Sequence, residues 1–414
     1  MMAISRYRDF VLVGDDVRKS RDGLVHSFVV RVFDSPVGQG EQKERVTLPE
    51  DLIRQIHRLE MGQFDQDVGR QMRLGESLAG LLLPRYARRL FGESLRRLRS
   101  GEGLRLRLRL ADELSDIPWE YMYIQDARGE RTPSSFLALD PQISIVRHEA
   151  LALPGDWFEA PGARRIVVAM ATPQPYDRYR KLEALPREQA LIKAALADLP
   201  GVEAVFLPEQ LQNLGDQISG ATFEAVLMAL TERTDILHFS GHGEFSGSPG
   251  PTFGCKLGVG GLVLADARNQ AFPIAADRFA ELLRGRGVRL VVLGACETGR
   301  RDGHNLWSGV AAAILKAGIP AVVAMQFSVQ DTLAAVFSGA FYRALVAGLT
   351  IDEAVSIGRI AMRGAASATI PDSRDWGVPV LYLRAAEGRV FNPVSDEAAR
   401  RAAEHSLGQF LEYR

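Results

Sequence analysis

The sequence is short of cysteine and of long apolar runs, and each shortage narrows what the chain can be. Only two cysteines, Cys255 and Cys296, occur among 414 residues. So few cysteines exclude a disulfide-rich secreted scaffold, and the first residues contain no apolar export signal. We therefore expect a cytoplasmic protein with reduced thiols. No apolar stretch approaches the length of a membrane span, so we expect no membrane association.

An excess of charge of either sign is also missing. The formal net charge is −1, with 50 basic and 51 acidic residues, so the overall charge gives no indication of a nucleic-acid partner. Histidine and cysteine do not recur at ligand spacing, which predicts no metal site, and we expect no cofactor. The hydrophobic share of 46% is that of a soluble globular protein.

The length favours two domains. A stretch with two prolines and two glycines at 151–162 is the best candidate linker. We predict an α+β domain at 1–160, a possible regulatory or pseudo-protease-like region. A second domain follows at 161–385, and a helical tail at 386–414.

The N-terminal part combines a predicted strand hairpin with helices. Residues 104–110 alternate leucine with arginine, which predicts a strand with one buried face. Its arginines either face solvent or pair with acids of a neighbouring strand. Two further strands are predicted at 136–139 and 143–147.

After residue 162 strands and helices alternate. Apolar runs at 165–171, 202–207, 236–240, 290–293, 321–325 and 378–383 have strand length, and helical patterns separate most of them. This order predicts an α/β fold with a mostly parallel sheet, covered by helices on both faces.

Two of these strands end in reactive side chains beside glycine. The first reads Ile236-Leu237-His238-Phe239-Ser240-Gly241-His242-Gly243, and the second Leu290-Val291-Val292-Leu293-Gly294-Ala295-Cys296-Glu297-Thr298-Gly299. The carboxyl ends of parallel strands gather at one edge, where ligands and chemistry collect. We expect the imidazole of His242 and the thiol of Cys296 to meet there.

Such a pair suits nucleophilic catalysis. A thiol reacts as thiolate, and a neighbouring imidazole favours that form. The backbone N–H groups of Gly243 and Cys296 are our candidates for the oxyanion hole. His238 is the rival histidine, and we interpret it as satisfied within the core. Cys255 has no histidine motif nearby, so we interpret it as a structural or inert thiol.

The paired motifs resemble those of the CHAT family of caspase-like cysteine peptidases. Further similar pieces are Ile117-Pro118-Trp119-Glu120, the run 261–266 and the run 321–327. The resemblance implies a caspase–haemoglobinase-like fold in which His242 is general base and acid and Cys296 is the nucleophile that cleaves peptide bonds. It also implies a protein substrate. Bacterial members often act in antiviral defence on gasdermin-like pore formers or other proteases, some under an activating partner.

Specificity rests on fewer residues. In caspase-like folds the segment after the strand that follows the cysteine lines the pocket for the residue before the scissile bond. Here it contains Gln326, Phe327 and Asp331 and no basic residue, and Asp266 and Glu297 lie in other segments of the rim. Acidic groups favour cleavage after a basic residue. The alternative for Asp331 is an N-cap of a helix beginning at residue 332.

Two other functions stay open. A catalytically silent interaction module of the same fold would keep both residues without cleaving anything. A nucleotide-binding enzyme is the second alternative, suggested by the glycine-rich run 258–261. That run lacks the Lys-Ser/Thr pair of a phosphate-binding loop and the strand–glycine–helix context of a dinucleotide site.

Overall fold

The computed structural model describes residues 4, 6–21, 23–40, 42–64, 67–125, 135–147, 164–179, 181–197, 202–211, 213–214, 217–218, 220–247, 258–294, 296–297, 306–369 and 372–384. Within these ranges only the backbone is described at 164, 213–214, 217–218, 245–247, 258–259, 296–297, 306–308 and 367–369. The predicted linker at 151–162, the predicted tail at 386–414 and Cys255 lie outside the described residues.

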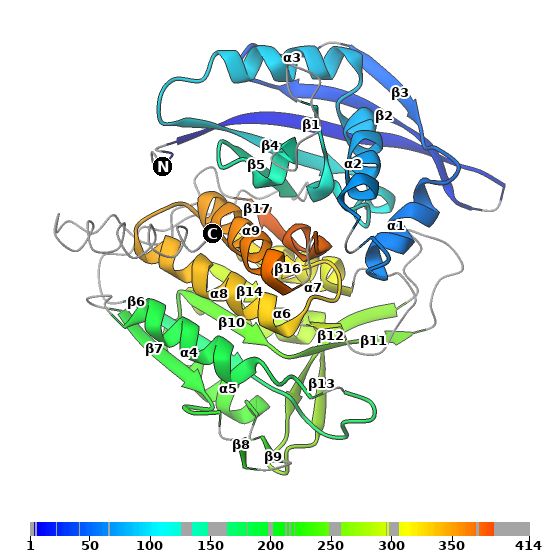
Figure 1. The fold of residues 1–414 in the computed structure, drawn as a ribbon. Coiled ribbons are helices and arrows are strands. Elements are labelled where there is room, and N and C mark those ends of the chain that lie inside the picture. The colour runs from blue at the N-terminus through cyan, green and yellow to red at the C-terminus, as the bar shows by residue number, and fades with distance from the viewer. Residues whose placement is uncertain are drawn as a thin grey trace.

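Eleven of the described strands form one sheet (Figure 1). In spatial order they are β3 (Lys43–Thr47), β2 (Val25–Asp34), β1 (Arg6–Lys19), β4 (Glu102–Leu110), β5 (Ile143–Arg147), β17 (Pro379–Leu383), β16 (Ala321–Met325), β14 (Leu290–Leu293), β10 (Ile236–Ser240), β6 (Arg164–Met170) and β7 (Val202–Leu207). The strands from β16 to β7 are parallel. β17 reverses direction against β16, and β5, β4 and β1 run parallel to β17. The predicted mostly parallel sheet is confirmed.

Helices cover both faces of the large sheet. Successive residues of a buried strand point to opposite faces, so each strand contributes apolar side chains to both helix layers. In β14, Leu290 and Val292 join the apolar cluster that contains residues of α4 (Leu185–Leu196), α8 (Asp331–Val346) and α9 (Ile351–Thr369). Val291 and Leu293 join the cluster that contains residues of α5 (Phe223–Ala229), α6 (Ala276–Leu283) and α7 (Leu306–Lys316). The α/β expectation with helices on both faces is therefore confirmed.

The N-terminal helices are α1 (Leu52–Glu60), α2 (Val68–Leu82) and α3 (Arg85–Arg96). Their buried residues belong to the same apolar cluster as those of α8 and α9. The pairing of β5 with β17 joins the N-terminal strands to the strands from β17 to β7. The proposed domains 1–160 and 161–385 therefore share one sheet. In Figure 1 the N-terminal strands lie at the top, with α8 and α9 between them and β6 and β7.

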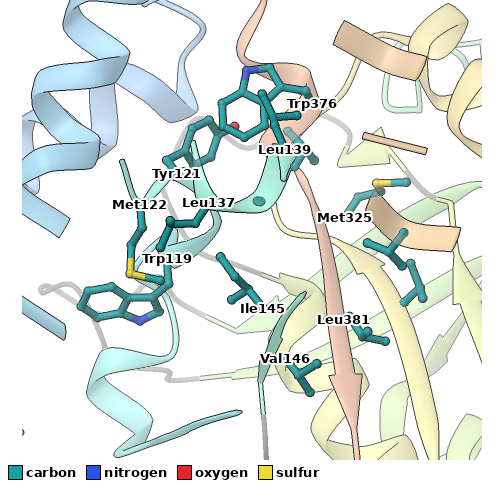
Figure 2. Packing of buried hydrophobic residues seen from close by; sticks show 14 of the residues in the cluster. Trp119, Tyr121, Met122, Leu137, Leu139, Ile145, Val146, Met325, Trp376 and Leu381 are labelled. Carbon is teal, nitrogen blue, oxygen red and sulfur yellow. The ribbon is translucent and has the colours of Figure 1, made fainter. Parts of the chain in front are cut away.

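Short 3₁₀ helices fill the junction between these parts. They are η1 (Asp112–Leu114), η2 (Trp119–Tyr121), η4 (Leu137–Leu139) and η5 (Arg374–Gly377). The strand predicted at 136–139 is wrong: the N–H of Leu139 donates to the carbonyl of Phe136 at 3.0 Å, so the segment closes its own turn. Figure 2 shows Leu137 and Leu139 beside Tyr121 and Trp376 in this packed region.

Two of the three arginines of β4, Arg105 and Arg107, are buried, and Arg109 is half-buried. Arg105 and Arg107 direct their Nε atoms to the carboxylate of Asp9 on β1, at 2.6 and 2.9 Å. Arg105 also lies 3.6 Å from a carboxylate oxygen of Asp352 on α9. Of the two alternatives, pairing with acids of a neighbouring strand is correct, and it joins β4 to the helix layer.

A second sheet of four strands lies at the ends of β10 and β14. Its order is β13 (Ala271–Ala275), β12 (Gly258–Ala265), β11 (His242–Gly247) and β15 (Cys296–Glu297). A two-stranded ribbon pairs β8 (Asn213–Leu214) with β9 (Gln217–Ile218). None of the helices in the described ranges is long and apolar enough to cross a membrane.

Candidate active site

The chain segments that follow β10 and β14 pass from the large sheet into the small one and carry the two predicted catalytic residues. In the large sheet Phe239 of β10 pairs with Leu293 of β14. Three residues later on each segment, His242 of β11 pairs with Cys296 of β15 in a parallel ladder. The register is therefore the same in both sheets. The structure places the backbones of His242 and Cys296 opposite each other on neighbouring strands, at the carboxyl ends of β10 and β14. Their catalytic role remains a prediction.

Glycines allow the two segments to pass from one sheet to the other. A Cβ added at Gly241 would lie 2.6 Å from Cζ of Phe239 and 3.0 Å from the carbonyl oxygen of Ala171. A Cβ added at Gly294 would lie 2.9 Å from Oγ of Ser240. Both transitions thus require a residue without a side chain, which explains the glycine in each motif.

His242 is fully buried, and an aromatic ring lies against its imidazole. The rings of Tyr179 and His242 are stacked, with centroids 5.7 Å apart and planes inclined by 29°. The hydroxyl of Tyr179 donates to Oε2 of Glu244 at 2.8 Å, and Arg178 forms an ion pair with the same carboxylate. Burial, followed by the hydrogen bond to Glu244, raises the pKa of Tyr179 to about 12. The hydroxyl therefore stays protonated and able to donate.

Tyr179 lies on a loop anchored at several points. The N–H of Gln174 donates to the carbonyl of Asn269, and the N–H of Ala271 donates to the carbonyl of Gln174, both at 2.8 Å. The N–H of Leu182 donates to Oγ1 of Thr172 at 3.0 Å. Sequence reasoning missed this loop. One signal was available: it directly follows the carboxyl end of β6, the neighbour of β10, where functional loops of such sheets gather.

His238 is held inside a polar cluster, as predicted. Its Nδ1 lies 3.1 Å from the hydroxyl of Tyr342, and its Nε2 lies 2.7 Å from Oγ of Ser240. Oε1 of Glu188 lies 3.4 Å from the same Nε2 and accepts a hydrogen bond from Ser338 at 2.6 Å. Burial, with a smaller contribution from Glu188, raises the pKa of Tyr342 well above its usual value. All five side chains of this cluster are buried, and the ring nitrogens of His238 both have partners within the protein.

Gln326, predicted to contact substrate, is occupied within the protein. Its amide nitrogen donates to Oε2 of Glu120 at 3.0 Å and to the carbonyl of Gly377 at 2.8 Å. Its amide oxygen accepts from Arg147 at 3.0 Å. With 2% of its surface exposed, Gln326 connects η2, β5 and η5, and its contacts are structural ones. Phe327 is also buried, with the guanidinium of Arg374 5.7 Å from its ring centroid.

Asp331 is the first residue of α8, and the N-cap is Gln330. The alternative that made Asp331 the N-cap is therefore wrong by one residue. Asp375 accepts a hydrogen bond from the N–H of Gln330 at 3.1 Å. Arg374 donates to the carbonyl of Ser328 at 2.9 Å, so the fold places a basic residue against a segment that contains none.

The other predicted rim residues have different surroundings. Oδ1 of Asp266 accepts from the backbone N–H groups of Arg268 and Gln270, each at 2.8 Å, and so stabilises a turn. Glu297 pairs with Gly243 in the β11–β15 ladder. Gly243 lies in a strand with partners on both sides. Because amides of such a strand face their neighbours, its N–H reaches a substrate only where this pairing opens.

The described residues contain no group of three or more His, Cys, Asp and Glu side chains that could hold a metal ion. The expected absence of a metal site remains a prediction for the whole chain.

Comparison with protein families gives one clear assignment. The family model of the CHAT domain matches residues 73–383, which is most of the chain. The chain belongs to the CHAT domain family. The match begins within α2, so the CHAT region includes part of the proposed N-terminal domain together with β4, β5 and the whole candidate site. No curated protein is similar enough to match.

Several solved structures resemble this CHAT protein. The Arg-specific cysteine proteinase gingipain R has a TM-score of 0.44 at 12% identity, covering 80% of this chain and 76% of its own. The complex of Porphyromonas gingivalis RgpB pro- and mature domains has a TM-score of 0.42 at 11% identity, covering 83% and 78%. In the Saccharomyces cerevisiae separase–securin complex the TM-score is 0.36 at 14% identity, covering 67% of this chain and 15% of the other.

Proposed function

We propose that this CHAT protein is a cysteine endopeptidase in which His242 and Cys296 form the catalytic dyad. The observation that carries the proposal is the register pairing of these two residues in the β11–β15 ladder. Neighbouring strands lie about 4.8 Å apart, so residues paired in a parallel ladder have their side chains next to each other on the same face. That spacing suits proton transfer between a thiol and an imidazole.

The proposed reaction uses only this chain, the substrate and water. His242 accepts the thiol proton, and the thiolate of Cys296 attacks the scissile carbonyl. Backbone N–H groups of Cys296 and of Gly243, once its pairing opens, donate to the oxyanion. The intermediate collapses as His242 gives the proton to the leaving amine. Water then hydrolyses the thioester with His242 as base, which releases the acid product and restores the thiol.

We propose cleavage after a basic residue. Glu297 is paired with Gly243, next to the proposed dyad in the β11–β15 ladder, and Asp331 and Asp266 are the other predicted acidic residues of the rim. Carboxylates at such positions favour a substrate arginine or lysine. Peptides varied only at the residue before the scissile bond test this preference. Faster cleavage after aspartate or a large apolar residue would contradict it.

The proposed biological role is based on the family resemblance. We propose a role in bacterial antiviral defence, with a protein substrate such as a gasdermin-like pore former or another protease. An activating protein partner is part of this proposal, because His242 is fully buried in this structure. The same burial favours the second candidate function, a catalytically silent interaction module.

Comparing protein cleavage in lysate by the wild type and by Cys296→Ala tests the proposal. New amino termini are labelled and identified by mass spectrometry, with the products of neighbouring genes as first substrates. Cys255→Ser is the matched control, because it removes the other cysteine. We expect cleavage by wild type and Cys255→Ser, and none by Cys296→Ala or His242→Ala. Identical termini in all four samples, with the neighbouring gene products present, would support the silent module.

A further inference from the structure

We propose that Tyr179 is a positioning residue that fixes the plane of the His242 imidazole, and that Glu244 and Arg178 hold Tyr179 in place. The inference rests on the proposed dyad and goes beyond it, because it assigns a role to a residue outside both catalytic motifs. Three observations carry it: the stacking of the two rings, the contacts that hold Tyr179, and its place outside the apolar cores.

The stacking contact restrains the imidazole through its face. With ring centroids 5.7 Å apart and an inclination of 29°, the tyrosine ring opposes rotation of the imidazole out of its plane. A face contact leaves the two ring nitrogens at the ring edge, where proton transfer takes place. Tyr179 therefore restrains the orientation of the base without occupying a nitrogen.

The hydroxyl end of Tyr179 is bound by the carboxylate of Glu244. His242 and Glu244 are two residues apart on β11, so both side chains lie on one face of the strand. Tyr179 spans them, with its ring on His242 and its hydroxyl on Oε2 of Glu244 at 2.8 Å. Arg178 pairs with the same carboxylate. The tyrosine thus has one partner at each end.

Core packing alone does not explain this tyrosine. It is 3% exposed, yet it belongs to neither of the two apolar clusters of the described residues. Its loop is anchored by the hydrogen bonds between Gln174 and the segment Asn269–Ala271. A loop that is anchored in this way and buries a tyrosine against the proposed base, outside both clusters, fits a positioning role.

The rate at which iodoacetamide alkylates Cys296 tests this role without a substrate. All proteins carry Cys255→Ser, so that one thiol remains. The variants are Tyr179→Phe, which keeps the ring face, and Tyr179→Leu, which removes it. His242→Ala is the reference for loss of the base, and circular dichroism and the melting temperature check the fold. Rates are measured from about pH 5 to 10, a range that includes the titration of a cysteine–histidine pair and of an unassisted thiol.

The inference predicts that Tyr179→Leu slows alkylation at pH 6 about tenfold, towards the rate of His242→Ala, and that Tyr179→Phe stays within about threefold of wild type. The variants should converge above pH 9, where the thiol ionises without help. If Tyr179→Leu reacts like wild type while His242→Ala is slow, the inference is wrong and the dyad stands. If His242→Ala also reacts like wild type, the proposed function itself is wrong. If Tyr179→Phe is as slow as Tyr179→Leu, the ring face without the hydroxyl does not position the imidazole, which overturns the proposal as stated.

Discussion

His238 and His242 are four residues apart in the chain, and their surroundings differ. His238 lies in β10 with polar partners near both ring nitrogens, Tyr342 on one side and Ser240 on the other. His242 lies in β11, stacked on Tyr179 and register-paired with Cys296. Both are fully buried, so burial does not distinguish them.

The difference follows from where each strand ends. In the interior of the large sheet a histidine needs fixed partners, because a buried polar group without a hydrogen bond is costly. Beyond Gly241 the chain belongs to the small sheet, where His242 pairs with Cys296 of β15. The same side chain is structural on one side of this glycine and, we propose, catalytic on the other.

The largest expected effect separates the two histidines by activity. His242→Ala should lower kcat/KM for the best peptide found by cleavage profiling about 10³-fold, because the general base is lost. The free energy of unfolding, measured in urea, should change by much less than the activation free energy of the reaction. Wild-type activity in His242→Ala would contradict a catalytic role for His242.

His238→Ala should act mainly on stability. It leaves the hydroxyl groups of Tyr342 and Ser240 and the carboxylate of Glu188 buried with one partner fewer, so we expect a loss of about 3 kcal/mol. Urea unfolding measures this loss, with His242→Ala as the matched control. A loss no greater than that of the control would contradict the structural role of His238.

Gly294→Ala should cost about 2 kcal/mol, because the new methyl group would overlap Oγ of Ser240 at 2.9 Å. The control is Gly80→Ala in α2, where nothing lies within 4 Å of the added Cβ and where alanine favours the helix. Thermal unfolding of the two variants should shift in opposite directions. Equal shifts would mean that the strand end tolerates a side chain.

The smallest effect concerns alkaline pH. Burial and then Glu244 raise the pKa of Tyr179 from 10.0 to about 12. A group whose pKa is raised on folding contributes stability that is complete below its unfolded pKa and is lost as the pH rises through its folded pKa. The stability advantage of wild type over Tyr179→Phe should therefore shrink between pH 10 and 12. Other buried tyrosines are common to both proteins and cancel, so a constant difference would contradict the raised pKa of Tyr179 and therefore its buried contact with Glu244.

The regular elements were predictable where local pattern and burial agree. Residues 202–207, 236–240, 290–293 and 321–325 begin and end in the structure where the apolar pattern places them. The segment 136–139 was not, because its four residues are apolar in either conformation and packing against Trp376 decides between them. The continuous sheet across both predicted domains depends on the β5–β17 pairing of residues more than two hundred positions apart.

The site was predictable only where a motif marks it. His242 and Cys296 stand beside glycines at strand ends, and the structure pairs their backbones. Tyr179 lies in a polar loop without periodicity, so only the fold brings it to His242. The internal partners of Gln326, which are Glu120, Arg147 and Gly377, also come from distant segments, and its contact with substrate stays a prediction. Long-range contacts between polar residues leave no local pattern.

Bridging with 1,3-dibromoacetone tests the central claim most directly, because its three-carbon link joins a thiol to an imidazole only when the two lie within a few ångströms. The protein is treated in a Cys255→Ser background, digested and analysed by mass spectrometry. The account predicts one bridged product that joins the peptide of Cys296 to the peptide of His242, absent from His242→Ala. A thiol that carries only a single unbridged adduct, or one bridged to His238, would contradict it.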